Sequence, residues 1–231
     1  MRRRATLILA GLTVVAAAVF LQFPDLDLAI SRATLRPDGH FLLYWVRSFY
    51  LLHQWLQYLV PAVIVFFAIA GIAWYRRRPV WGITAWQALY VIAVFAIGPG
   101  LLVNTVLKDN SHRPRPGDTQ EFGGKWAYAP PLDFGGACDD NCSFVAGDPA
   151  AGFGFLAPAL LLPARRRTAG IAGALILGGV IGAMRILQGG HFFSDVIFCG
   201  LVVAATALTL HWAMFGADEA PRGRWGQRLS S

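Results

Sequence analysis

Long apolar runs constrain this chain more than any other feature of its sequence. A helix needs about 20 apolar residues to cross the hydrocarbon core of a bilayer, and six runs approach that length. They lie at about residues 5–23, 56–75, 83–107, 149–163, 168–188 and 192–215. Only 14% of the 231 residues are charged, against about 25% in an average soluble domain. We therefore expect an all-α, polytopic protein whose six transmembrane helices form one membrane-embedded domain over residues 1–231.

Two of the runs have a second interpretation. The run at 149–163 is short and contains Pro158 and Pro163, so taken alone it also fits a re-entrant segment, although the overall topology requires it to span. The run at 5–23 follows a cluster of arginines, as in a secretory signal. Its apolar core is longer than the usual signal, so we expect an uncleaved anchor. Cleavage would leave the remaining topology unchanged.

Arginine clusters give the expected orientation. They fall at every second boundary between the runs, at residues 2–4, 76–78, 165–167 and at Arg222, Arg224 and Arg228. Under the positive-inside rule, this alternation places both termini in the cytoplasm, with a tail at 216–231. The clusters also account for the formal net charge of +7. We therefore expect the lipid bilayer as a partner and no nucleic acid, and the sequence leaves the oligomeric state open.

The segment 108–148 is then a loop on the periplasmic side of a bacterial-type inner membrane. It contains Cys138 and Cys142, which face an oxidising compartment and lie close enough in sequence to form a disulfide. No second pair stands nearby to complete four zinc ligands, so we expect no metal. Upstream, the stretch 24–55 mixes aromatic residues with a few polar ones, including His53. It resembles an interfacial amphipathic helix that anchors the fold or, alternatively, gates the substrate.

Three groups of polar residues, distant in sequence, are expected at this outer face. The first contains Lys108, Arg113 and Arg115. Three cations beside prolines suit a multiply charged oxyanion, although basic side chains at a helix end also simply extend toward lipid head groups. The second group, Gly147 and Asp148, begins the fourth run, where exposed backbone amides form an anion site. Asp148 alternatively serves only as the helix cap.

The third group, Arg185, His191 and Asp195, joins the last two runs. If the final helix begins near His191, the spacing of four residues places Asp195 on the same helix face. Its carboxylate then holds one imidazole nitrogen as N–H and leaves the other free to attack or to take a proton. Ionisable residues at membrane depth are costly and usually functional, so this group predicts a catalytic site.

Two of these groups carry a family resemblance. The matches are Lys108, Arg115 and Pro116 to K-x6-RP, and Arg185, His191 and Asp195 to R-x5-H-x3-D. The chain therefore resembles the type-2 phosphatidic acid phosphatase superfamily over nearly its whole length. The middle motif differs, because the family usually has P-S-G-H where residues 145–148 are V-A-G-D, and Met184 stands where a serine is common. The outer loop is similar to that of the bacterial lipid A phosphatase branch.

The resemblance implies a membrane lipid phosphatase, a phosphoric ester hydrolase that uses no cofactor and forms a phosphohistidine. It implies that His191 is the nucleophile and that Asp195 orients it. The groups that bind the phosphoryl oxygens are then Lys108, Arg115, Arg185 and the amide of Gly147. A lipid keeps its acyl chains in the bilayer while its phosphate enters such a site. The expected substrate is therefore a lipid A-like phosphomonoester or an isoprenyl diphosphate.

The resemblance leaves the proton donor open. In the family, the middle-motif histidine protonates the leaving oxygen, and Asp148 occupies that position here. Asp148 itself donates if burial raises its pKa, or His112 takes over the proton. The third alternative is a catalytically weak or inactive protein that binds lipid phosphates.

Overall fold

The computed structural model describes residues 2–216 and contains only helices and connecting segments within that range. The long α-helices are α1 (Arg2–Gln22), α4 (Leu59–Tyr75), α5 (Ala85–Phe95), α9 (Ala164–Leu187) and α10 (Phe193–Phe215). The shorter elements are α2 (Leu26–Ala33), α3 (Arg47–Leu56), the π-helix η1 (Ala96–Leu107), α6 (Lys108–Asn110), the 3-10 helices η2 (Pro116–Asp118) and η3 (Gln120–Phe122), α7 (Gly147–Gly154) and α8 (Leu156–Leu160). The C-terminal arginine cluster at Arg222, Arg224 and Arg228 lies outside the described residues.

Five helical stretches of the described chain are long and apolar enough to cross a membrane. They are Arg3–Gln22, Leu51–Tyr75, Ala85–Asn110, Ala164–Leu187 and Phe193–Phe215, and they coincide with five of the six predicted runs. This confirms the prediction of a polytopic all-α membrane protein. The run at 149–163 instead forms α7 and α8, of eight and five residues. Pro158 has no N–H to bond the carbonyl of residue 154, which is where α7 ends.

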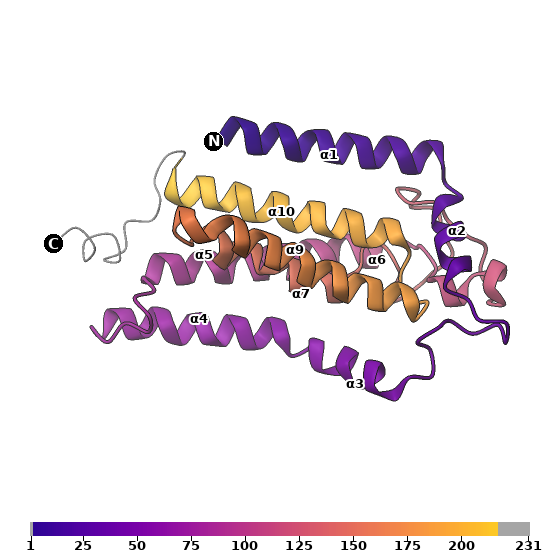
Figure 1. Ribbon diagram of the computed structural model, residues 1–231, viewed down its shortest axis with the longest axis horizontal. Helices are drawn as coiled ribbons and strands as arrows, with labels where there is room; N and C mark the ends of the chain where they lie inside the picture. The colour runs from indigo at the N-terminus through magenta and orange to yellow at the C-terminus, as the bar shows by residue number, and fades with distance from the viewer. Residues whose placement is uncertain (1, 217–231) are drawn as a thin grey trace.

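The long helices lie side by side along the longest axis of the molecule (Figure 1). The start of α1, the α4–α5 connection, the start of α9 and the end of α10 are at the left of this view. The three arginine clusters within the described chain therefore share one end of the bundle. The opposite end carries α2, α3 and the 108–148 loop, and we call it the loop end.

Apolar side chains are exposed on the outside of the bundle. Leu7 of α1, Ile69 of α4 and Ile176 of α9 are 71%, 58% and 65% exposed. An outer surface of this kind suits contact with lipid chains rather than water. Charged side chains show the opposite pattern at the loop end, where Arg113 and Asp195 are buried. Burial of charged side chains therefore indicates that a functional site lies at the loop end.

Glycines allow α7, α9 and α10 to pack closely. A Cβ added to Gly152 of α7 would lie 2.8 Å from the Cα of Gly178 in α9, and one added to Gly182 would lie 2.3 Å from a methyl group of Val196 in α10. Small residues let membrane helices approach backbone to backbone. The start of α7, the end of α9 and the start of α10 are thereby held together at the loop end.

The predicted interfacial stretch forms α2 and α3, which Figure 1 places at the loop end. Trp45, Trp55 and Tyr58 are exposed around α3, as expected for aromatic side chains at a membrane–water interface. At its other end, α3 leads into α4 within the candidate span Leu51–Tyr75. The stretch thus runs directly into the second span.

Candidate active site

A cavity of about 420 Å³ lies at the loop end. Its walls come from α3, α4, η1, α6, α7, α9 and the segments that connect them. Six of the predicted site residues line it, namely Lys108, Arg115, Gly147, Asp148, Arg185 and His191. The fold thus brings all three polar groups of the sequence to one cavity. The apolar residues Leu56, Val60, Pro61 and Ala151 also line it, and the remaining lining residues are His53, Gln57, Asn104 and Asn141.

His191 follows the turn at Gly189 and Gly190 and is 2% exposed. Its Nδ1 lies 2.8 Å from the backbone carbonyl oxygen of Ser143. A carbonyl only accepts hydrogen bonds, so Nδ1 carries the proton and Nε2 keeps a free lone pair. Burial, together with the positive charges of Arg185 and Arg115, lowers the pKa of His191 to about 4 against the opposing effect of Asp195. The ring is therefore neutral at pH 7, as a nucleophile must be.

Asp195 supports His191 less directly than the sequence predicts. Its Oδ2 is 3.7 Å from the Nδ1 of His191, which is too long for a hydrogen bond. The carboxylate instead accepts hydrogen bonds from the side chains of Arg113 and Ser143 and, at 2.8 Å, from the N–H of Phe192. Asp195 therefore fixes Ser143, and the carbonyl of Ser143 fixes the imidazole.

Arg113 does not join the other two cations of its motif. It is 1% exposed, and its guanidinium lies between the carboxylates of Asp27 and Asp195. It also donates hydrogen bonds to the hydroxyl of Ser194 at 2.8 Å and to the carbonyl of Ala129 at 2.9 Å. Two buried carboxylates need a cation between them. The expectation that Arg113 binds an oxyanion is therefore wrong, and Lys108, Arg115 and Arg185 are the motif cations that line the cavity.

Asp148 has two basic neighbours. Its Oδ2 lies 2.6 Å from Nδ1 of His53 and 3.0 Å from Nε of Arg185. Burial alone would raise the pKa of Asp148, but the hydrogen bond from His53 and the charge of Arg185 lower it below its usual value. The alternative in which burial raises the pKa of Asp148 and makes it the proton donor is therefore not supported, and Asp148 is an ionised acceptor. Its carboxylate has no proton to donate at neutral pH.

His53 is a titratable residue of the cavity that the sequence did not single out as a site residue. It belongs to α3, lines the cavity and contacts Asp148. An ionisable residue where an interfacial helix enters an apolar span is itself a functional signal. Nothing in the local sequence, however, pairs it with a residue 95 positions later.

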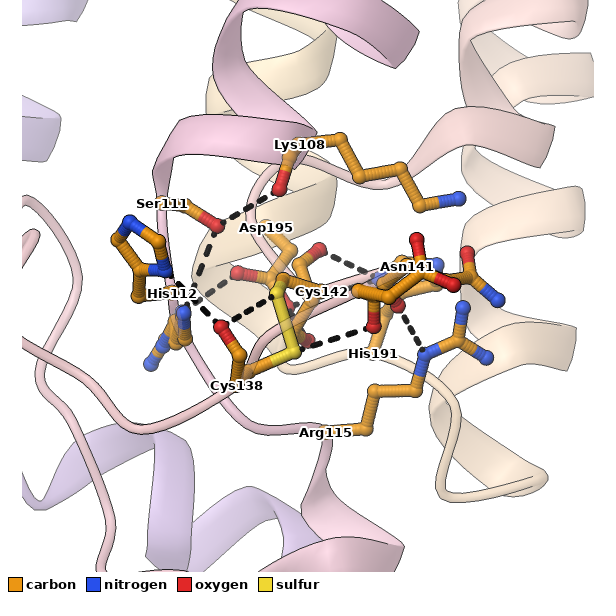
Figure 2. Close-up of a disulfide and its surroundings, with 12 residues drawn as sticks. Lys108, Ser111, His112, Arg115, Cys138, Asn141, Cys142, His191 and Asp195 are labelled. Atoms are coloured by element: carbon orange, nitrogen blue, oxygen red, sulfur yellow. Dashed lines mark hydrogen bonds and ion pairs between the residues drawn. A yellow bond between two sulfur atoms is a disulfide. The ribbon is translucent and has the colours of Figure 1, made fainter.

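The disulfide predicted between Cys138 and Cys142 is confirmed, with their Cα atoms 5.8 Å apart. Figure 2 shows it beside Arg115 and Asn141. The carbonyl of Asn141, inside the closed loop, accepts a hydrogen bond of 3.0 Å from Nε of Arg115. The covalent loop thus positions a cation of the cavity.

His112 lies on the other side of the disulfide from Arg115 in Figure 2. It is exposed, and its Nδ1 is 3.0 Å from the carbonyl of Cys138. It does not line the cavity. The structure therefore does not bring this alternative proton donor to the site.

Gly147 stands where η1 meets the start of α7. A Cβ at this position would lie 2.4 Å from Oδ1 of Asn104, whose Nδ2 donates a hydrogen bond of 2.7 Å to the carbonyl of Pro99. Any other residue here would displace the Asn104 side chain from this position. Across residues 2–216, no group of three or more His, Cys, Asp or Glu side chains is placed to hold a metal ion.

Comparisons with known proteins agree with these motifs. The protein-family model described as the PAP2 superfamily matches residues 84–219 of this chain. A lipid A 4'-phosphatase of Francisella tularensis subsp. novicida (strain U112) is 35% identical over 205 residues, which are 87% of this chain and 91% of that protein. A lipid A 4'-phosphatase of Rhizobium leguminosarum is 38% identical over 122 residues, which are 52% of each chain. No solved structure matches the chain significantly.

Proposed function

Because the chain belongs to the PAP2 superfamily, we propose that it is a membrane lipid phosphatase that removes phosphate from a lipid A-like glycolipid. The observation that carries the proposal is one cavity in which three cations, from Lys108, Arg115 and Arg185, face a neutral, buried histidine. The similarity to lipid A 4'-phosphatases over 87% of the chain supports the choice of substrate.

The proposed reaction starts with attack by Nε2 of His191 on phosphorus. Lys108, Arg115 and Arg185, with the amide of Gly147, bind the phosphoryl oxygens, where electrostatic stabilisation supplies most of the catalysis. Asp195 holds the nucleophile in place through Ser143. The phosphohistidine that forms is then hydrolysed by water.

The place of the cavity supports a lipid substrate. Val60 and Pro61 in its lining belong to the candidate span Leu51–Tyr75. A phosphate in the cavity is thus next to the apolar part of the bundle, where acyl chains remain in the bilayer. In bacteria we place this end at the periplasmic face of the inner membrane, because the described arginine clusters are at the opposite end.

Purified protein is expected to release inorganic phosphate from lipid A in the presence of EDTA, because the proposed nucleophile and cations are all side chains. The assay compares lipid A with phosphatidate, phosphatidylglycerophosphate and isoprenyl diphosphate, with and without EDTA. Activity that is lost on chelation and restored by a divalent cation would contradict the phosphohistidine mechanism. No release from any of these lipids would favour a lipid-phosphate-binding protein, in line with the missing middle-motif histidine.

A cysteine placed at Ala127 is expected to react with an impermeant maleimide in intact spheroplasts, because this exposed position lies in the proposed outer loop. The matched control is a cysteine at Pro79, which is also exposed but lies at the arginine-rich end. It should react only after permeabilisation. The native cysteines do not interfere, since Cys138 and Cys142 are bonded and Cys199 is buried. The reverse labelling pattern would overturn the orientation.

A further inference from the structure

His53 reaches the cavity from α3, which lies outside the segments that carry the family motifs. Its side chain is 25% exposed and lines the cavity together with Lys108, Arg185 and His191. The helices α3 and α7 are in contact, which brings His53 to the first turn of α7. An imidazole therefore stands next to the position where the family usually has a histidine.

The contact between His53 and Asp148 defines which ring nitrogen of His53 is available to a ligand in the cavity. Asp148 is ionised, so it accepts, and Nδ1 of His53 carries the proton of the 2.6 Å hydrogen bond. Nε2 has no hydrogen-bond partner among the residues that the structure describes. The carboxylate thus orients the ring through Nδ1 and leaves Nε2 for a ligand in the cavity.

We propose that His53 donates the proton to the leaving oxygen of the lipid phosphate, and that Asp148 is the residue that positions it. This inference rests on the proposed function. As the lone pair of His191 Nε2 forms a bond to phosphorus, the ester P–O bond breaks, and the leaving oxygen takes the proton from Nε2 of His53. Water then attacks the phosphohistidine, His53 takes back a proton from that water, and His191 leaves as a neutral imidazole with inorganic phosphate as the product.

Two other donors fit the geometry less well. Asp148 accepts a hydrogen bond and an ion pair through the same oxygen, and both interactions favour its ionised form. His112 is exposed and does not line the cavity. His53 is a titratable group of the lining that serves neither as the nucleophile nor as a phosphate-binding cation in the proposed reaction. From α3, His53 thus supplies the proton-donating imidazole that the middle motif lacks in this chain.

The test compares two phosphate esters built on the same acyl-chain anchor, one with an alkyl and one with a nitrophenyl leaving group. The alkoxide needs a proton to leave, whereas the nitrophenolate hardly does. His53→Gln keeps a side-chain N–H for Asp148 but cannot donate a proton at neutral pH. We expect it to slow the alkyl ester by roughly 10²-fold or more and the nitrophenyl ester far less. The matched control, His112→Gln, should leave both rates unchanged.

The outcomes separate the candidates. If His53→Gln slows both esters equally, or slows neither, His53 only joins α3 to α7 and the inference fails. A selective loss on the alkyl ester in Asp148→Asn that exceeds the loss in His53→Gln would make Asp148 the donor instead. If the wild-type protein hydrolyses neither ester nor lipid A, the proposed function itself fails, whatever the variants do.

Discussion

Replacing His191 with alanine is expected to abolish phosphate release while the protein remains folded. The imidazole is the proposed nucleophile that the three cavity cations face, so its loss removes the reaction path rather than one stabilising contact. Removal of a catalytic nucleophile typically lowers kcat by about 10⁴-fold or more. Because the hydrogen bond to Ser143 ends at a backbone carbonyl, its loss leaves no side chain charged and unpaired.

The measurement has two parts. Phosphate release from lipid A is compared between wild type and His191→Ala, and rapid acid-free quenching traps phosphoenzyme made from radiolabelled substrate. The matched control is His40→Ala, which removes an exposed histidine that stacks on Tyr44 outside the cavity. His40→Ala should keep both activity and phosphoenzyme. Activity of His191→Ala within tenfold of wild type, or phosphoenzyme on another residue, would contradict the assignment.

Much of the fold was predictable because membrane spans are specified locally. Each span needs a long apolar run, and each described arginine cluster lies at the end of the bundle that the alternation assigned to it. The fourth run was the difficult case, since Pro158 interrupts it and its glycines, Gly152 and Gly154, serve contacts with α9 and α5. Such contacts depend on a partner helix, and the apolar length of one segment carries no information about them.

The site was predictable only as far as its motifs extend. Lys108, Arg115, Arg185 and His191 were found by spacing and do line one cavity. His53 was missed because its link to Asp148 depends on how α3 packs against α7. A site residue of this kind can be identified only from the packing of the helices.

Arg113 shows the same limit of prediction from sequence. Its replacement is the most severe test of whether this arginine binds phosphate or belongs to the buried core. The sequence groups it with Lys108 and Arg115, but it pairs with two buried carboxylates, Asp27 and Asp195. Arg113→Met keeps the length of the side chain and removes its charge. Breaking a buried ion pair by removing one partner typically costs about 3 to 5 kcal/mol. We therefore expect a fall of at least about 6 °C in the melting temperature of the protein in detergent.

The matched control is Arg115→Met, the same change two residues later in the cavity wall. It should lower phosphate release by roughly 10²-fold and leave the melting temperature nearly unchanged. If Arg113→Met instead keeps its melting temperature and loses activity as Arg115→Met does, the grouping of three phosphate-binding cations is right and the assignment of Arg113 to the core is wrong.

The pH dependence of Arg113→Met gives an independent check. Burial already raises the pKa of Asp27, even with Arg113 beside it to lower it. Without the arginine, the folded protein holds the Asp27 proton more tightly than the unfolded chain does. Folding stability then falls as the pH rises through the folded-state pKa, so the difference in melting temperature from wild type should widen from acidic to neutral pH. Asp27→Asn in the same background should reduce this widening, because the amide has no proton to lose, while Asp195, which also loses its ion pair with Arg113, still titrates.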